Sequence, residues 1–396
     1  MSDHYRRLAG PSPAGWRWPA GLIPGLVGVA LLLLAGLGLA PLAYAEAEAT
    51  YVYTTPQKLD DGWAVSSLEA EGMDTGVIEK MTSAILSDKY KHIYSLAIVK
   101  NGKLVHEAYF NGRNRDSRVK IHSITKSVTS MLIGIAIDQG HIDSLDRTVM
   151  SYLPEYAKYV DDDRINTITL GHILTLKTGW KWDEQTVIYD DPDNSHYWME
   201  ESDDWLQYVI EKPLADEPGE RFVYNTGAVH LLSGVIKNTT GMYANKYAEK
   251  VLFEPLGITE YKWITDNKGY PCTGGSNGGL CINARDLAKI GLMVMRGGEW
   301  NGKQVVPTEW LAESTSGRFK VGNIQNFGYL WWSGNFKIKG RKLDHVQASG
   351  YGGQMLHMVP EIDLVIVFQS WSRDEGADIL APLLMTYNAA LTGSEE

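Results

Sequence analysis

The sequence predicts an α+β fold, with an antiparallel sheet built from both ends of the globular region and a large helical insertion between them. Runs with alternating or continuous apolar character fall at residues 95–110 and again at 342–369. The stretch between them shows the three- and four-residue apolar spacing of amphipathic helices. A chain of this order favours a sheet flanked by helices, with a functional cleft between the sheet and the insertion.

Composition sets the broad class. The chain has 396 residues, 44% of them hydrophobic, which suits one large or two ordinary globular domains. Its formal net charge is -11, and its lysines and arginines form no basic stripe. These features argue against nucleic acid as a partner.

The N-terminal segment has the pattern of an export signal. Three arginines precede an apolar run over residues 20–42, and Ala43-Tyr44-Ala45 then forms a small-x-small cleavage pattern before Glu46. The run is also long enough to span a bilayer as an uncleaved anchor. Residues 1–45 are therefore interpreted as a signal peptide or membrane anchor, with cleavage after Ala45 favoured. We expect an exported chain, periplasmic or secreted, with attachment to the inner membrane as the alternative.

The globular region begins with an arm and a hairpin. Residues 46–65 are expected to form an N-terminal arm, and residues 66–396 the folded domain, opening with a helix over 72–90. Asn101-Gly102 separates two apolar runs, 95–99 and 103–110. An Asn-Gly pair in this position is typical of a tight turn in a β-hairpin.

The segment from His122 to Ala136 is expected to be a helix that ends at Gly140. Apolar residues recur along it at helical spacing, so one face should be buried. Ser123 lies at or just before the first turn, and Lys126 follows on the same face. A lysine whose pKa is lowered can activate a serine hydroxyl as a nucleophile. The alternative is that Ser123 only caps the helix.

The remaining elements follow from periodicity and turn residues. Lys177-Thr178-Gly179 is interpreted as a turn, and the acidic, aromatic stretch 183–197 either as a loop that lines a cleft or as a solvated loop. Further helices are expected at 168–176, 228–239, 241–251, 283–295 and 379–391, and strands at 328–333, 342–348, 354–359 and 364–369.

Two cysteines, Cys272 and Cys281, flank a glycine-rich loop over 274–280. In an exported protein they are candidates for a disulfide; the alternative is a pair of unpaired buried thiols. Two cysteines do not suggest a zinc site, and no Lys-Ser/Thr follows the glycines as a phosphate-binding loop requires.

The order of motifs resembles the serine hydrolases of the β-lactamase and penicillin-binding-protein fold, especially the class C and esterase-like branch. The resemblance covers roughly residues 95–391 and includes similarity to the 6-aminohexanoate-oligomer hydrolases. It rests on four elements in order: Ser123-Ile124-Thr125-Lys126, Tyr224-Asn225-Thr226 after Pro218-Gly219, Gly278-Gly279-Leu280 before Arg285-Asp286-Leu287, and Gly350-Tyr351-Gly352-Gly353-Gln354. The implied fold is β-lactamase/transpeptidase-like.

The resemblance also implies roles for individual residues. Ser123 matches the nucleophile, Lys126 its general base, and Tyr224 the tyrosine that shares proton transfer, although a buried core tyrosine is the alternative for Tyr224. The oxyanion hole is implied to be the backbone N–H groups of Ser123 and Tyr351. The residues expected to contact substrate are Asn225, Ser349, Gly350, Tyr189 and Trp180; the aromatic ones could equally belong to the core of the insertion.

Two positions depart from the family pattern. Thr226 stands where the second motif has asparagine, and Ala348 stands where β-lactamases have the lysine of the strand motif. His345 lies too far along the chain to replace that lysine. Because the lysine helps to bind the carboxylate of a β-lactam or peptidoglycan peptide, we expect a less acidic substrate and no efficient β-lactamase activity.

The resemblance thus implies a serine hydrolase that cleaves an amide or ester bond of a small molecule through an acyl-enzyme on Ser123, with no metal and no organic cofactor. One alternative is a slowly acylating or non-catalytic receptor of cell-wall fragments. Another is a purely structural envelope protein, whose serine would not react with a serine-directed phosphonate.

Overall fold

The computed structural model describes residues 50–322, 325–372 and 377–392. The predicted signal peptide or anchor, residues 1–45, lies outside the described residues. Residues from Glu48 onward form one compact unit. Across the described ranges, no helix combines the length and the apolar character that a membrane crossing needs.

One eight-stranded antiparallel sheet forms the centre of the fold, in the order β2-β1-β13-β12-β11-β10-β9-β8. The first two strands come from the start of the domain and the others from its end, which confirms the predicted α+β architecture. The strands are β1 (Ile93–Lys100), β2 (Lys103–Tyr109), β8 (Phe319–Val321), β9 (Gln325–Phe327), β10 (Trp332–Ile338), β11 (Arg341–Gly350), β12 (Gln354–Val359) and β13 (Leu364–Ser370).

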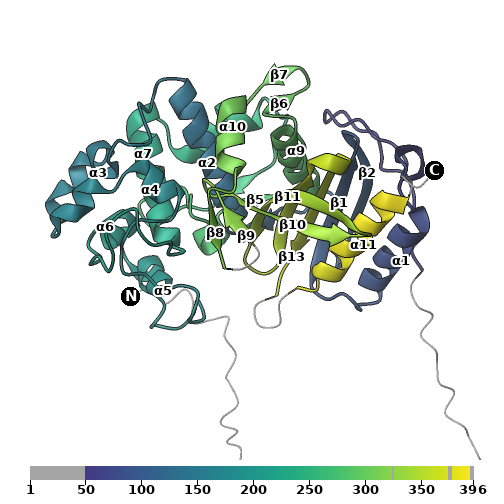
Figure 1. Ribbon diagram of the computed structural model, residues 1–396, viewed down its shortest axis with the longest axis horizontal. Helices are drawn as coiled ribbons and strands as arrows, with labels where there is room; N and C mark the ends of the chain where they lie inside the picture. Colours follow the sequence, from purple (N-terminus) through teal and green to yellow (C-terminus); the bar gives the residue numbers. More distant parts are fainter. Residues whose placement is uncertain (1–49, 323–324, 373–376, 393–396) are drawn as a thin grey trace, which may run out of the picture. The chain divides into compact units, whose positions relative to one another are not determined.

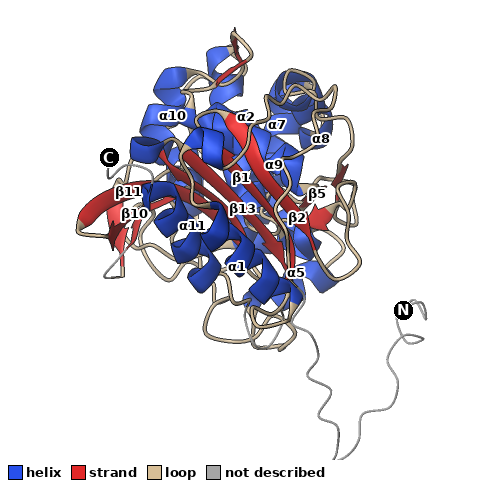
Figure 2. Cartoon of the chain, turned by 90° about the vertical axis from the view of Figure 1, so that its right-hand side faces the viewer, coloured by secondary structure: helices blue, strands red, loops and turns tan. Residues whose placement is uncertain are grey.

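The central strands are buried on both faces because helices cover both. In β1, Leu96 and Ile98 join one hydrophobic cluster while Ala97 and Val99 join the other, as the alternation of a strand requires. The first cluster lies under α1 (Thr75–Leu86) and α11 (Leu380–Thr392), which pack side by side on one face of the sheet (Figure 2).

The helical insertion follows β2 and reaches the opposite face of the sheet, where α9 contacts β1 and β13 (Figure 1). Its helices are joined by loops, short 3₁₀ helices and small strands. The helices are α2 (Ile124–Asp138), α3 (Val149–Tyr152), α4 (Leu170–Leu174), α5 (Ser195–Glu201), α6 (Trp205–Ile210), α7 (Thr226–Thr240), α8 (Ala244–Ala248), α9 (Ala284–Met295) and α10 (Thr308–Thr315). Two small sheets, β3-β5-β4 and β6-β7, comprise β3 (Val119–Lys120), β4 (Lys262–Trp263), β5 (Leu280–Ile282), β6 (Glu299–Trp300) and β7 (Lys303–Gln304).

The predicted hairpin turn is confirmed. β1 and β2 pair up to Lys100 opposite Lys103, and both Asn101 and Gly102 have positive φ, 51° and 75°. This backbone matches the twist of the flanking strands, which explains the choice of Asn-Gly.

The strand expected over 328–333 is wrong for most of its length. Gly328 donates its N–H to the carbonyl of Trp331, Leu330 has a φ of 61°, and β10 begins only at Trp332. The apolar run is buried as a tight turn, with the Leu330 amide bonded to the carbonyl of Leu174. A short apolar run alone does not distinguish such a turn from a strand.

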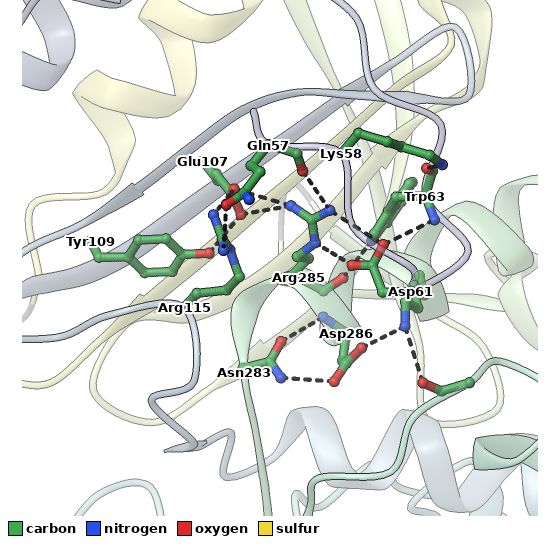
Figure 3. A network of polar contacts seen from close by, with 12 residues as sticks. Gln57, Lys58, Asp61, Trp63, Glu107, Tyr109, Arg115, Asn283, Arg285 and Asp286 are labelled. Atoms are coloured by element: carbon green, nitrogen blue, oxygen red, sulfur yellow. Dashed lines mark hydrogen bonds and ion pairs between the residues drawn. The ribbon is translucent and has the colours of Figure 1, made fainter. Parts of the chain in front are cut away.

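The described part of the N-terminal arm packs along the domain, and an ionic network connects the arm to it (Figure 3). The Arg285 guanidinium at the start of α9 contacts the carboxylates of Asp61 in the arm and Glu107 in β2, the latter at 3.0 Å. Trp63 is fully buried, and its indole N–H donates to the carbonyl of Arg285 at 3.2 Å. Tyr53 hydrogen-bonds to the carbonyl of Val105 at 2.9 Å.

Candidate active site

Ser123 immediately precedes the first turn of α2 and does not cap it. The helix begins at Ile124, and the Ser123 side chain makes no capping hydrogen bond. The alternative that Ser123 serves only as a cap therefore finds no support, and its hydroxyl is available to other groups.

Close backbone packing holds this serine in place. Ile121 and His122 donate their N–H groups to the carbonyls of Leu280 and Gly278, at 2.9 and 3.0 Å. His122 has a φ of 48°, an unusual conformation for a non-glycine residue directly before a functional side chain. A Cβ on Gly350, at the end of β11, would collide with the carbonyl of Ile121. Glycine there lets the strand end approach the segment that carries Ser123.

Lys126 is buried beside Ser123, as the three-residue spacing predicts. Its Nζ lies 3.0 Å from Ser123 Oγ, 2.8 Å from Thr226 Oγ1 and 2.5 Å from the carbonyl oxygen of Gly274. Burial disfavours the ammonium form and lowers the pKa of Lys126 to about 8, against an opposing effect of the Glu184 carboxylate. A lysine with this pKa is able to accept a proton near neutral pH.

Tyr224 lies next to both residues. Its hydroxyl shares a side-chain hydrogen bond with Ser123, and Lys126 Nζ lies 4.7 Å from the centroid of its ring. Burial, and secondly the charge of Glu184, raise the pKa of the Tyr224 hydroxyl above its usual value. The phenol is therefore protonated at neutral pH and suited to pass on a proton.

A buried carboxylate completes the surroundings of Lys126. Glu184 is 2% exposed and accepts hydrogen bonds from the Thr226 hydroxyl at 2.6 Å, the Thr226 N–H at 2.8 Å and the Trp182 indole at 2.6 Å. Thr226 thus connects Glu184 to Lys126. Among the described residues, the chain Glu184–Thr226–Lys126–Ser123 is continuous.

Ser123 and Tyr224 open into a pocket of about 260 Å³. The described residues that line it are all uncharged. They are Ser123, Gln185, Tyr189, Tyr224, Gln325, Trp332, Ser349, Gly350 and Tyr351. Tyr189 and Tyr351 meet edge to face, with ring centroids 5.1 Å apart. The geometry suits a neutral molecule with polar and aromatic contacts.

The structure brings most of the predicted site residues together. Ser349 and Gly350 come from the end of β11 and Tyr351 from the turn after it, so their place in the pocket follows from the close approach of β11 to residue 121. Ala348 is buried in the hydrophobic core and does not line this pocket. His345 stacks on Phe336, with ring centroids 5.0 Å apart, and does not line this pocket.

Two of the residues predicted to contact substrate do not line this pocket. Asn225 is fully buried, and its Oδ1 accepts the Ala228 N–H at 2.8 Å, so it caps α7 instead of lining the pocket. Trp180 is also fully buried, in the core of the helical region, where its backbone pairs with Leu214. The aromatic side chain that reaches the pocket from this part of the chain is Tyr189.

The disulfide candidate is also wrong, because Cys272 and Cys281 are both free, buried thiols. Cys281 lies in β5, opposite Lys120 and Lys262, outside the main core. Cys272 packs into that core, and its N–H donates to the carbonyl of Ile264. The two thiols thus belong to different environments, although they are close in sequence.

Sequence reasoning missed Glu184, the carbonyl of Gly274, and the lining residues Gln185, Gln325 and Trp332. It noted Thr226 only as a departure from a motif. One signal pointed towards Glu184: it lies in the acidic, aromatic stretch 183–197, which was interpreted either as a loop that lines a cleft or as a solvated loop.

Comparisons with known proteins indicate the family to which the chain belongs. The family model described as Beta-lactamase matches residues 78–384. The chain is 26% identical to the 6-aminohexanoate-dimer hydrolase of Paenarthrobacter ureafaciens, over 69% of this chain and 71% of that protein. It is 23% identical to esterase EstB of Burkholderia gladioli, over 38% of this chain and 39% of the relative.

A solved structure shares the fold. A candidate 6-aminohexanoate-dimer hydrolase from Bacillus anthracis superposes with a TM-score of 0.65 and 21% identity, covering 85% of this chain and 86% of that one. The family match spans most of the domain, and it includes the segments that carry Ser123, Lys126 and Tyr224. The chain therefore belongs to the β-lactamase family of serine hydrolases, which act on amide or ester bonds.

Proposed function

We propose that this enzyme hydrolyses uncharged esters or amides through a covalent acyl-enzyme on Ser123. The observation that carries the proposal is the contact of 3.0 Å between Ser123 Oγ and the buried Lys126 Nζ, with Tyr224 hydrogen-bonded to the same serine. The hydrolases and esterase among its relatives support this reaction class.

In the acylation step, Ser123 Oγ attacks the carbonyl carbon of the substrate while Lys126 takes the hydroxyl proton. Negative charge builds on the carbonyl oxygen, and the backbone N–H groups of Ser123 and Tyr351 stabilise it. When the intermediate collapses, Tyr224 gives a proton to the leaving amine or alcohol and is reprotonated from Lys126. The carbon to leaving-group bond breaks, and an ester on Ser123 remains.

In the deacylation step, water attacks this ester and Lys126 accepts one of its protons. The bond between the acyl carbon and Ser123 Oγ breaks, Ser123 Oγ takes that proton back through Tyr224, and the acid product leaves. These roles agree with the two pKa shifts, since the lowered pKa of Lys126 makes it the base and the raised pKa of Tyr224 keeps it a proton donor.

The charge of the pocket supports a neutral substrate. Its described lining has no cationic side chain, and alanine at position 348 removes the lysine expected in β-lactamases. A carboxylate bound there would lose its hydration without gaining a charged partner. Esters and amides without an acidic group next to the scissile bond avoid that cost.

Steady-state and burst kinetics test the proposal. The full-length chain is expected to release p-nitrophenol continuously from p-nitrophenyl butyrate, and at least about tenfold more slowly from the anionic p-nitrophenyl hemisuccinate. A chromogenic cephalosporin should be a poor substrate. Release of one product per enzyme without turnover would contradict the proposal and favour a receptor that traps its ligand.

A further inference from the structure

The carboxylate of Glu184 has a hydrogen-bonding pattern that determines what its neighbours can do. Its Oε2 accepts the N–H groups of Thr226 and Trp182, at 2.8 and 2.6 Å, and its Oε1 accepts the Thr226 hydroxyl at 2.6 Å. All three partners, and the Tyr189 hydroxyl 3.5 Å from Oε1, are donors in these contacts. An ionised carboxylate, which only accepts, matches them.

This arrangement fixes the hydroxyl of Thr226. A hydroxyl has one proton to donate, and Thr226 gives it to Glu184. Towards Lys126 Nζ, 2.8 Å away, Thr226 Oγ1 can therefore only accept. The carbonyl oxygen of Gly274, 2.5 Å from the same nitrogen, is likewise only an acceptor.

These two acceptors orient the neutral amine. An uncharged lysine has two N–H bonds and one lone pair, and Thr226 and Gly274 take both N–H bonds. The lone pair then faces the remaining neighbour, the Ser123 hydroxyl at 3.0 Å. We propose that Glu184 is a positioning residue which, through Thr226, makes Lys126 present its lone pair to Ser123. The inference rests on the proposed role of Ser123 as nucleophile.

Glu184→Gln tests the inference with little change in shape. In this variant, the N–H groups of Thr226 and Trp182 keep the amide oxygen of the glutamine at the position of Oε2. The amide NH₂ group then takes the position of Oε1 and donates to Thr226 Oγ1. The Thr226 hydroxyl must therefore donate its own proton to Lys126 Nζ, which occupies the lone pair of the amine. We expect the rate of Ser123 phosphonylation by a fluorophosphonate to fall about 100-fold. With p-nitrophenyl butyrate, kcat should fall much more than KM rises.

The pH profile gives a readout that a purely structural role would not move. The titratable groups that face Lys126 are Glu184, Tyr224 from the start of α7, His122 before α2, and His196 of α5. Of these, the Glu184 charge raises the pKa of Lys126. In Glu184→Gln, the rise of the phosphonylation rate with pH should therefore shift to lower pH. The maximal rate, reached at high pH, should be lower than in the wild type.

Two further variants complete the design. Thr226→Ser keeps the hydroxyl and should be less impaired than Thr226→Val, which tests the same connection if Glu184→Gln does not fold. The matched control is Glu71→Gln, since Glu71 is also a buried carboxylate, paired with Lys103 at 2.6 Å and outside the pocket. Its reaction rate should match that of the wild type.

A folded Glu184→Gln enzyme that reacts at the wild-type rate, with the same acid limb, would overturn the inference. Equal rates for Thr226→Ser and Thr226→Val would do the same. Failure of the wild-type enzyme to react would instead reject the proposed function, so the two failures are distinguishable.

Discussion

Beside Ser123, the proposed nucleophile, lie two titratable groups whose pKa values are shifted in opposite directions. The pKa of Lys126 is lowered to about 8, mainly by burial, and that of Tyr224 is raised, also mainly by burial. Burial acts in opposite directions because the charged form is protonated in lysine and deprotonated in tyrosine. The same burial therefore favours an uncharged amine and an uncharged phenol side by side.

The pKa of Lys126 predicts how the reaction depends on pH. Only the neutral amine can take the serine proton, so the rate of fluorophosphonate labelling should rise with pH through about 8 and then level off. The measurement is the labelling rate of the wild-type enzyme from about pH 6 to about pH 10. Lys126→Arg keeps a positive charge that cannot be lost. This variant should therefore abolish the labelling and its dependence on pH. A wild-type rate that is flat across this range would contradict the assignment of the base.

The sequence predicted some site residues well because their contacts are local. Ser123 and Lys126 are three residues apart, and helical geometry alone places them together. Glu184 and Thr226 are 42 residues apart and meet only through packing of a loop against α7. Asn225 was predicted to contact substrate, whereas its side chain caps α7; a capping asparagine and a substrate-binding asparagine look alike in a single sequence.

At the scale of elements, α2 is buried almost throughout because other helices and the sheet pack on several of its sides. From Ile124 to Ala136 every residue is buried. At Gly134, the ring of Trp310 in α10 occupies the space that a Cβ would take. The absence of a side chain at Gly134 therefore lets α10 pack directly on α2.

Gly134→Ala is expected to destabilise the protein, although alanine favours helices. The propensity gain is about 0.5–1 kcal/mol, but overpacking against Trp310 costs about 1–3 kcal/mol. Gly76→Ala in α1 is the matched control, since Gly76 is exposed and has only Asp74 nearby, so this change should be neutral or stabilising. Chemical denaturation of both variants measures the free energy of unfolding. A Gly134→Ala protein as stable as Gly76→Ala would contradict this account of the packing.

Elements with a strong periodicity of apolar residues could be predicted from the sequence, and elements with a weak periodicity could not. The hairpin around Asn101-Gly102 and the helices α1, α2, α7 and α9 all have clear patterns and lie where expected. The strands β8 and β9, at one end of the sheet, have three residues each and a mixed burial pattern, so they offered no signal. The turn at 328–331 was misassigned because tertiary burial, not alternation, made it apolar.

For the molecule as a whole, the two ends of the domain meet in one sheet. β1 pairs with β13 along its length, so strands from both ends of the domain are neighbours, and helices α3, α4, α6 and α7 of the insertion lie beside the sheet (Figure 1). The site lies where these parts meet, with Ser123 and Tyr224 from the insertion and Ser349 to Tyr351 from the sheet. The alternating runs at both ends of the domain made this topology predictable.

The contacts that hold the N-terminal arm against the domain could not be predicted from the sequence. Arg285 binds Asp61 across 224 residues and Glu107 across 178 residues (Figure 3). Buried ion pairs of this kind depend on the completed fold, and local periodicity carries no trace of them. The sequence indicated an arm over 46–65, but not its partners.

Intact mass spectrometry of the chain after incubation with a fluorophosphonate shows whether Ser123 is an activated nucleophile. We expect one adduct on the wild-type enzyme and none on Ser123→Ala or Lys126→Ala, each checked for folding by circular dichroism. An adduct of the same mass on Ser123→Ala would place the reactive group elsewhere. No adduct on the folded wild-type enzyme would contradict an activated serine at position 123.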